Sequence, residues 1–361
     1  MIKKIFGTAI IALVSMQALF AQDSTKSLSF SGSVDAYYRY NFANANDGHS
    51  SNNYTSFTNS QSSFALGMAS IRADATALKG KVTATADLGF GPRAQEFSYS
   101  EATNNTTLAM VKQMFVTVAV SDKVKLTAGK FATHIGYEVV DPFLNKNYSM
   151  SYMFTNGPFS HTGVKADITA GPVGLMFGVA NYIDQAISTT NVQTLIAQVS
   201  GGSKDGKLKA YLNYAGFYGS KEGANPSGLA AFTQLDFVLT DLLSDKFNLG
   251  FNATMQSRTQ VAKSESPSGA WWGVALYLNA TPTPAVTLTL RSEYIGDSKM
   301  VYYSTKNIFA NTISLNYQVG PVTFIPEFRF EFAQSGTFYT KNDGAGQSST
   351  ATLLMAAVYR F

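Results

Sequence analysis

The chain has 361 residues and contains no cysteine, so disulfide bonds, thiolate metal sites and cysteine nucleophiles are excluded. Charged residues make up only 14% of the sequence and aromatic residues 13%, whereas soluble domains carry roughly 25% charged residues. The formal net charge is +4, and it falls to +2 without Lys3 and Lys4, because 25 basic residues (27 − 2) then face 23 acidic ones. This balance gives no reason to expect a nucleic-acid partner.

The N-terminal segment has the pattern of a secretory signal peptide. Lys3 and Lys4 precede a mostly apolar run from Ile5 to Phe20, and the small residue Ala21 follows it. Such a run is shorter than a comfortable transmembrane helix, and the small residue at its end is typical of a cleavage site. We therefore expect residues 1–21 to be a signal peptide and residues 22–361 to form one exported domain.

The first predicted strand covers residues 28–42, where apolar side chains occupy the even positions and mostly polar ones the odd positions. Successive side chains of a strand point to opposite faces, so a period of two predicts a strand with one apolar and one polar face. The same alternation returns at 82–90, 161–170, 247–255 and 322–332. We expect the apolar faces to contact lipid and the polar faces to line a wet interior.

The connectors between the predicted strands alternate in length, which is typical of outer-membrane barrels. Residues 22–361 are therefore predicted to form an all-β fold, a transmembrane antiparallel up-and-down β-barrel of about 16 strands. The strands near 63–77 and 108–120 have an ambiguous face, so the count is open by two, and a secreted β-sandwich also shows alternation. The long polar connectors fall at 43–62, 91–108, 132–159, 183–192, 219–228, 258–269, 297–306 and 334–349.

The last predicted strand ends on an aromatic residue, Phe361, and its alternate positions back to Leu353 are apolar or aromatic. This ending resembles the assembly signal of outer-membrane barrel proteins. It implies two partners, the barrel assembly machinery and outer-membrane lipid.

Charged residues recur on the polar faces of the predicted strands. A barrel of about 16 strands encloses an aqueous lumen, and charges at membrane depth are tolerated only in water or in pairs. These residues are therefore predicted to line the pore, and many are expected to pair across neighbouring strands as well. Their mixed signs leave the choice between anions and cations open. The predicted pore-lining residues are Asp35, Arg39, Arg72, Asp74, Lys165, Arg291, Glu293, Glu327, Arg329 and Glu331.

The third long connector, residues 132–159, is rich in aromatic and aliphatic side chains that a solvated extracellular loop would not expose. We expect it to fold into the barrel and narrow the lumen, although packing over the barrel top or at a subunit interface would also bury it. In the inward arrangement, its polar residues would define the constriction. They are His134, Glu138, Asp141 and Lys146.

The same region carries a family resemblance. The segments "GKF-T-IGYE", "NYS-S" and "GPFSHTG", which follow "VKQMFVTV", resemble the Gram-negative family of OmpL-like β-barrel porins, most densely in Val111–Gly163. The resemblance implies a single outer-membrane barrel through which small polar solutes or ions diffuse passively, and it names no particular solute. Porins of this size resemble trimers. A homotrimer could use a small-residue face formed by Ala65, Gly67, Ala69, Ala73 and Ala75.

The sequence is compatible with two other functions. "HSSNN", from His49 to Asn53, holds the residue types of an outer-membrane phospholipase site, but a catalytic constellation demands geometry that a Ser- and Asn-rich loop does not promise. His134 and Glu138 would converge on a metal only on a helix, and none is predicted there, so neither metal, cofactor nor enzyme activity is expected. The remaining alternative is an adhesion or binding barrel with a closed lumen, although the neutral polar connector 43–62 suits solvation better than specific contact.

Overall fold

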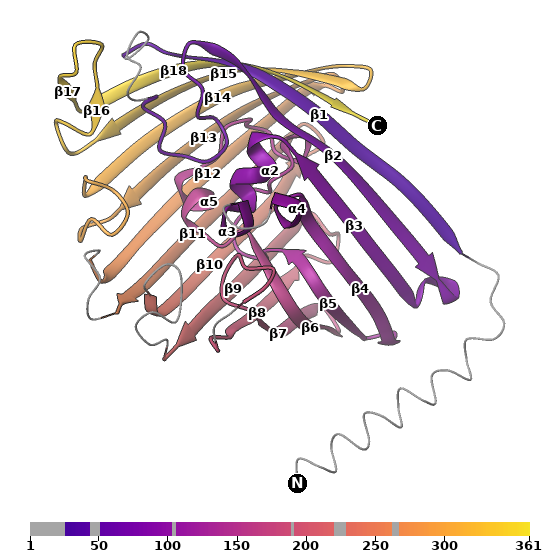
Figure 1. Ribbon diagram of the computed structural model, residues 1–361. Helices are drawn as coiled ribbons and strands as arrows, with labels where there is room; N and C mark the ends of the chain where they lie inside the picture. Colours follow the sequence, from indigo (N-terminus) through magenta and orange to yellow (C-terminus); the bar gives the residue numbers. More distant parts are fainter. Residues whose placement is uncertain (1–25, 44–50, 103–105, 189–190, 220–228, 262–266) are drawn as a thin grey trace.

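The computed structural model describes residues 26–43, 51–102, 106–188, 191–219, 229–261 and 267–361. Within these residues, sixteen strands form one closed antiparallel barrel, in which β1 pairs with both β2 and β18 (Figure 1). The fold prediction is therefore confirmed, including the even strand count. The wall strands are β1 (Ser27–Asn41), β2 (Ser63–Ala77), β3 (Val82–Phe90), β4 (Val111–Ser121), β5 (Val124–Ala132), β6 (Ser160–Ala170), β7 (Val173–Ala180), β8 (Thr194–Gly202), β9 (Leu208–Tyr218), β10 (Leu229–Ser244), β11 (Phe247–Gln260), β12 (Gly269–Thr283), β13 (Val286–Gly296), β14 (Asn307–Val319), β15 (Val322–Ala333) and β18 (Ser349–Arg360).

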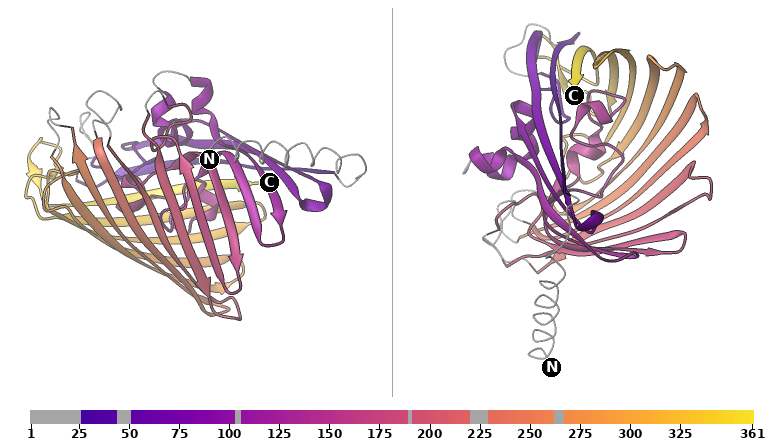
Figure 2. Two further views of the ribbon diagram at one scale, coloured as in Figure 1. Left: turned by 90° about the horizontal axis from the view of Figure 1, so that it is seen from below. Right: turned by 90° about the vertical axis from the view of Figure 1, so that its right-hand side faces the viewer.

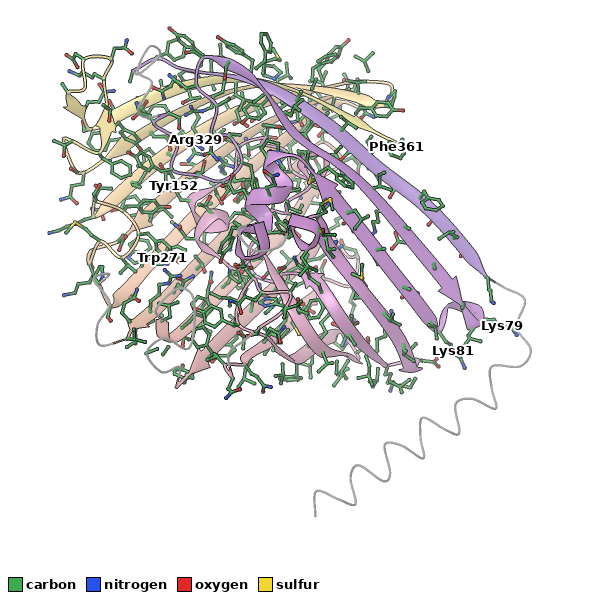
Figure 3. All side chains as sticks on the ribbon, viewed as in Figure 1. Lys79, Lys81, Tyr152, Trp271, Arg329 and Phe361 are labelled. Atoms are coloured by element: carbon green, nitrogen blue, oxygen red, sulfur yellow. The ribbon has the colours of Figure 1, made fainter. Side chains whose placement is uncertain are left out.

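The side-chain alternation of each strand sets which residues face outward and which face inward. On β1, Phe30 and Val34 are 66% and 51% exposed, whereas Asp35 and Arg39 are 3% and 2% exposed. Side chains cover both surfaces of the wall (Figure 3). Closure of the barrel gives every wall strand a hydrogen-bonded neighbour on both sides, so no unpaired edge of the described wall strands faces outward. Together with the apolar outer surface, this suits a hydrocarbon environment.

Short turns join the strands at one end of the barrel and long loops join them at the other. We name the first four loops L1 (residues 42–62), L2 (91–110), L3 (133–159) and L4 (181–193). No helix in the described part of the chain is long and apolar enough to cross a membrane. The remaining elements are η1 (Leu78–Gly80), α2 (Pro92–Phe97), α3 (Tyr99–Ala102), α4 (Thr106–Ala109), η2 (Pro142–Leu144), α5 (Tyr152–Asn156), β16 (Tyr339–Thr340) and β17 (Gly346–Gln347).

A β-bulge in β2 explains why the face of this strand was ambiguous in the sequence. The register with β1 shifts between Val34 and Ala36, and the N–H of Met68 turns inward to donate to Asp35 over 3.0 Å. A Cβ on Gly67 would collide with the Asp35 carboxylate, so this position requires glycine. The predicted small-residue face is consequently wrong at Ala65 and Gly67, which lie on the inner side. The outer face of β2 carries Phe64, Leu66, Ala69, Ala73 and Ala75.

Pro326 lies inside β15, where it has no N–H to donate. On one side, the pairs with β14 run from Glu327–Ser314 to Phe324–Tyr317 without a pair between them. On the other side, Pro326 pairs with Met355 of β18. A proline is tolerated inside a strand at such a locally unpaired position, because no ladder hydrogen bond is required from it there.

The wall is not equally tall around the barrel. Strands β3 to β8 have 8 to 11 residues each, whereas β10, β11 and β12 have 16, 14 and 15. Figure 2 shows the long, tilted orange strands on one side and the shorter purple and magenta strands on the other. The barrel therefore has a low side and a high side.

Candidate functional site

Loop L3 lies inside the barrel, where its middle is shielded from solvent. Tyr148, Met150 and Tyr152 are each 0% exposed. The right-hand view of Figure 2 shows the magenta segment of this loop surrounded by the wall. L3 therefore divides the interior, and its attachments decide where space remains.

Arg291 of β13 is a main attachment point of L3. Its Nη1 donates to Glu138 over 2.7 Å and to the carbonyl of Ser149 over 2.6 Å, and its Nη2 donates to the carbonyl of Met150 over 3.2 Å. The guanidinium is fully buried. A buried cation is stable only when its donors are matched in this way, so Arg291 and L3 require each other.

Carboxylates of the wall accept the main-chain donors of L3. The N–H of Tyr148 donates to Glu327 over 2.8 Å, and the N–H of Tyr152 donates to Glu293 over 2.8 Å. The Tyr152 hydroxyl donates to Glu331 over 2.7 Å. L3 has little regular secondary structure, so these acidic side chains provide acceptors that a helix or sheet would otherwise supply.

Arg329 of β15 neutralises this acidic group. It forms ion pairs with Glu293 over 3.2 Å and with Glu331 over 2.9 Å, and it donates to the carbonyl of Met150 over 2.8 Å. Figure 3 shows Arg329 and Tyr152 in the same part of the interior. We call the wall formed by Arg291, Glu293, Glu327, Arg329 and Glu331 the anchor side.

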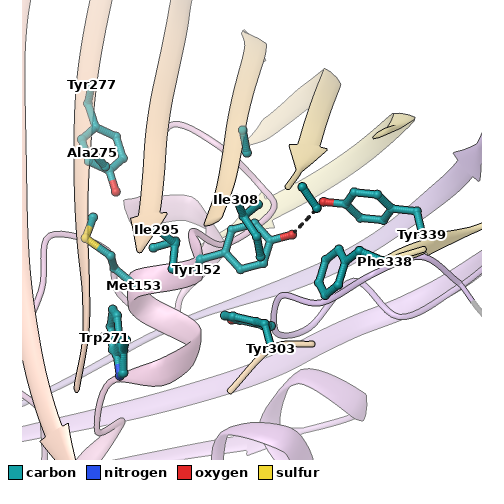
Figure 4. Packing of buried hydrophobic residues seen from close by; sticks show 12 residues of the cluster. Tyr152, Met153, Trp271, Ala275, Tyr277, Ile295, Tyr303, Ile308, Phe338 and Tyr339 are labelled. Carbon is teal, nitrogen blue, oxygen red and sulfur yellow. Dashed lines mark hydrogen bonds between the residues drawn. The ribbon is translucent and has the colours of Figure 1, made fainter. Parts of the chain in front are cut away.

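The helix of L3, α5, adds apolar packing next to these charges. The Ser151 hydroxyl caps its N-terminus by accepting the N–H of Phe154 over 3.1 Å. Met153 lies between Tyr277 and Trp271 of β12, while the Tyr152 hydroxyl meets Tyr339 (Figure 4). The loop is therefore held by both directional bonds and burial.

Loop L1 also enters the interior, so its predicted solvation is wrong for residues 51–60. Arg39 of β1 donates to the carbonyls of Ser51 and Ser60 over 2.8 and 2.9 Å. Phe57 is 2% exposed, and the Tyr54 ring stacks on Phe338 at 4.3 Å. The polar composition of L1 did not reveal that its main chain would satisfy an interior arginine.

Arg93 of α2 joins three loops and was not identified in the sequence. It is 0% exposed, and its guanidinium lies over Phe57 of L1 at 4.9 Å and over Tyr148 of L3 at 4.7 Å. It also donates to the carbonyls of Val140 and Tyr148 over 3.2 and 3.3 Å. An arginine in a loop gives no sequence signal for insertion, because its partners lie in other loops.

A cluster of apolar side chains covers part of the interior next to β5–β10. Phe217 of β9 stacks on Phe232 of β10 at 5.8 Å and packs against Tyr182 of L4 at 4.8 Å. We call this cluster the apolar side. It comprises Phe131, Ile135, Met176, Tyr182, Ile183, Val192, Ile196, Ala215, Phe217, Leu229 and Phe232.

The predicted pore-lining residues fall into two groups by exposure. Asp35, Arg39 and the five residues of the anchor side are buried beneath the loops, with Asp35 accepting the Tyr148 hydroxyl. Arg72, Asp74 and Lys165 are partly exposed, and Arg72 pairs with Asp74 over 2.7 Å. Only the second group faces unoccupied space.

The predicted constriction residues take separate partners. Glu138 pairs with Arg291, and Asp141 pairs over 2.5 Å with Lys112 of β4, which sequence reasoning missed. A register shift in β4 turns Lys112 inward, and alternation alone does not reveal such a shift.

The other two predicted constriction residues lie next to cavities. His134 contacts the Tyr214 carbonyl over 3.0 Å, and burial lowers the pKa of His134 to about 4. Lys146 lines a cavity next to L3.

Two cavities lie between L3 and the wall opposite the anchor side. One of 440 Å³ is lined by residues of β4–β7, including Lys165, and one of 600 Å³ by residues of β8–β12, including Asn248. His134 lines both. The two cavities therefore meet at one side chain of L3.

A closed barrel of this size with loops folded into it defines the class of outer-membrane channel folds. The chain belongs to the family described as "Putative beta-barrel porin-2, OmpL-like", which matches residues 27–361. This confirms the family resemblance seen in the sequence. A search of curated proteins found no match.

Solved structures show the same fold. The outer membrane channel DcaP of Acinetobacter baumannii has a TM-score of 0.63 at 13% identity, covering 95% of this chain and 99% of that one. An anion-selective porin from Comamonas acidovorans has a TM-score of 0.60 at 12% identity, with 93% and 100% covered. OmpT of Vibrio cholerae in its trimer form has a TM-score of 0.57 at 12% identity, with 94% and 100% covered. Sequence identities this low support a shared fold and do not identify the transported solute.

Proposed function

We propose that the protein is an outer-membrane porin that lets small hydrophilic solutes or ions diffuse passively along the wall opposite the anchor side. Family membership and the closed barrel support this function. The carrying observation is that L3, whose buried charged contacts concentrate on the anchor side, leaves cavities of 440 and 600 Å³ along the opposite wall, both lined by His134. A loop fixed to one wall narrows the lumen while leaving the other wall accessible.

Export to the outer membrane of a Gram-negative bacterium belongs to the same proposal. The pattern of residues 1–21, which lie outside the described residues, supports a signal peptide. The aromatic ending at Phe361 supports recognition by the barrel assembly machinery, and the apolar outer wall supports contact with outer-membrane lipid.

The apolar side favours a second candidate function, a binding barrel with a closed lumen. Phe217, Phe232 and Ile196 of this cluster are at most 2% exposed. Apolar side chains packed this closely leave no path for water between them. The phospholipase alternative depended on His49, which lies outside the described residues.

Single-channel conductance of the refolded protein in a planar bilayer tests the porin function. Stable conductance steps with a size cut-off for added sugars are expected. Deletion of Ile135–Asn156 should raise the conductance, because the wall charges that L3 now covers would then face a water-filled lumen. Silence from a folded, heat-modifiable barrel would contradict the porin and support the closed binding barrel. Deletion of the exposed turn residues 341–345 is the matched control and should leave the conductance unchanged.

We propose a homotrimer that forms through the low side of the barrel. The outer surface of β3–β9 contains a concavity of 1220 Å³ lined by apolar side chains that include Val116, Val164 and Leu195. A second copy could fill it with its own apolar wall. Val164→Trp, which fills this concavity, should dissociate the trimer in a detergent-corrected mass measurement, whereas Leu353→Trp on the outer face of β18 should not. An unchanged mass for Val164→Trp would contradict this interface.

A further inference from the structure

A third cavity, of 310 Å³, lies among the loops and the loop ends of β10 and β11. Its lining comes from L1, L2, L3, L4 and the loop between β13 and β14. It is separate from the two cavities that meet at His134, with which it shares no lining residue. The side chains that decide its chemistry are Glu96, Tyr99, Phe159, Asp184, Arg258 and Tyr302.

Arg258 is the unusual member of this lining. It pairs across the sheet with buried Phe232, so it points inward, and its guanidinium lies over Tyr302 at 4.4 Å. Within the described chain, the guanidinium has neither an ion pair nor a hydrogen bond, and its Nε is buried without a partner. Arg39, Arg291 and the other inward-facing arginines named above all have oxygen partners. A buried donor of this kind calls for an acceptor, and a carboxylate matches the planar fork of a guanidinium.

Two carboxylates line the same cavity without reaching Arg258. Asp184 accepts the N–H groups of Phe159 and Ser160 over 2.6 and 2.8 Å and the Tyr99 hydroxyl over 3.0 Å. Glu96 uses one oxygen, Oε2, to accept the N–H of Phe57 over 2.9 Å and the Asn59 amide over 2.9 Å. Across the described residues, no ion pair joins either carboxylate to Arg258. The cavity thus presents opposite charges that the protein itself leaves apart.

Aromatic rings form the remainder of the lining. Phe159 stacks on Phe97 at 5.7 Å and on Phe154 at 5.2 Å, which fixes its orientation. Tyr302 is held by a hydrogen bond of 2.9 Å from its hydroxyl to Gln256. Rigid aromatic walls with a few convergent polar groups are typical of sites for small organic molecules, whose cavities start at roughly 300 Å³.

We propose that this cavity binds a small zwitterion, an α-amino acid with an apolar side chain. The solute carboxylate meets Arg258, its ammonium group meets Glu96 and Asp184, and its apolar group packs between Phe159 and Tyr302. This inference rests on the proposed porin function in that the site would select solutes at the loop end of the channel. Binding itself does not require conduction.

Binding of phenylalanine to the refolded full-length protein in detergent tests this site, with tryptophan fluorescence as the readout. Trp271 lies 5.8 Å from the Tyr302 ring and is expected to respond to an occupant. Hydrocinnamate retains only the carboxylate and phenethylamine only the ammonium group. Each is expected to bind at least tenfold more weakly than phenylalanine. Equal binding of hydrocinnamate, or no binding of any of the three compounds, would overturn the proposal.

Two variants test which charged side chain contacts which charged group of phenylalanine. Arg258→Gln should weaken phenylalanine binding at least tenfold, and Glu96→Gln should weaken phenylalanine but leave hydrocinnamate unchanged, because a glutamine oxygen still accepts the Phe57 and Asn59 donors. Arg360→Gln is the matched control, since Arg360 also lies over an aromatic ring, that of Phe143 at 4.8 Å, near the opposite end of the barrel. Heat-modifiability confirms that each variant is folded. Unchanged phenylalanine binding by Arg258→Gln would overturn the site.

The conductance measurement separates this inference from the proposed function. A barrel that shows no conductance but still binds phenylalanine through Arg258 would contradict the porin function and support the binding site. A barrel that conducts but does not bind phenylalanine would contradict the binding site and support the porin function.

Discussion

The anchor side and the apolar side of the interior hold the same loop by different physical means. On the anchor side, Arg291, Glu293 and Glu327 bond to particular main-chain atoms of L3. On the apolar side, Ile135 of L3 packs among Phe131 and Phe217. The bonds that flank it join His134 to the Tyr214 carbonyl and the N–H of Gly136 to Asp236, and neither is a salt bridge. Buried charges tolerate only the position in which all are matched, whereas apolar packing is non-directional and tolerates repacking. The comparison indicates that the charges fix where L3 lies and the apolar cluster fixes how much space is left.

The largest expected effect comes from breaking the anchor side. Arg291→Gln leaves the buried Glu138 without its cation and leaves Glu293 with Arg329 alone. Removing one partner of a buried ion pair typically costs about 3–5 kcal/mol. L3 should detach, and the amide hydrogens of Tyr148 and Tyr152 should lose most of their protection against exchange. Arg72→Gln is the matched control, because Arg72 and Asp74 are more than one-third exposed and such pairs contribute about 0–1 kcal/mol.

The double variant Arg291→Met with Glu138→Gln sharpens this test. It removes one partner together with the cation, so fewer charges remain uncompensated, and part of the lost protection should return. Wild-type exchange rates in the Arg291→Gln variant would show that L3 is held mainly by apolar packing.

The next effect comes from opening the apolar side. Phe217→Ala removes a ring from the cluster at a local cost of about 3 kcal/mol, but it leaves every bond of the anchor side intact. Conductance should rise while the exchange protection of Tyr152 stays unchanged. Phe328→Ala on the outer face of β15 is the control and should alter neither quantity. A loss of Tyr152 protection in Phe217→Ala would mean that the two sides do not act separately.

A smaller effect is expected from Asp184, which links L4 to L3. Burial raises the pKa of Asp184 from 3.8 to about 6. A raised pKa means that the folded arrangement holds the proton more tightly, so the stabilisation is complete below pH 3.8 and is lost as pH rises through 6. After correction for intrinsic rates, protection of the Phe159 and Ser160 amides should fall over this range.

Asp184→Asn should remove this pH dependence, because an asparagine oxygen still accepts both donors and carries no charge. The comparison with wild type is made by hydrogen exchange at matched pH values. A pH profile that persists in the variant would assign the titration to another group.

The smallest effect is expected from His134, where the two larger cavities meet. Burial lowers its pKa to about 4, so the imidazole is neutral at physiological pH. His134→Gln should therefore leave the pH profile of the conductance unchanged between about pH 5 and 8. A decrease in wild-type conductance over this interval that disappears in His134→Gln would contradict the neutral imidazole.

The sequence predicted the fold and the direction of many side chains because both depend on local alternation. Asp35, Arg39 and Glu327 face inward as the period of two requires. The pattern failed at Gly67 and did not reveal Lys112, since a bulge or register shift moves one residue to the other face. The polar composition of L1 gave a wrong prediction of solvent exposure for residues 51–60. Their main-chain carbonyls accept from Arg39, which lies on a strand and not in the loop.

By itself, the sequence determined that this chain closes into a barrel, because each residue's face depends only on its neighbours and lipid selects the apolar face. Only the tertiary structure decided which wall carries most of the charged contacts of L3, that Arg93 joins three loops, and that Arg258 has neither an ion pair nor a hydrogen bond among the described residues. Glu138 and Arg291 are 153 residues apart, and Tyr148 and Glu327 are 179 apart. Such contacts arise from the closure of the barrel and the entropy of its loops, which no local pattern encodes.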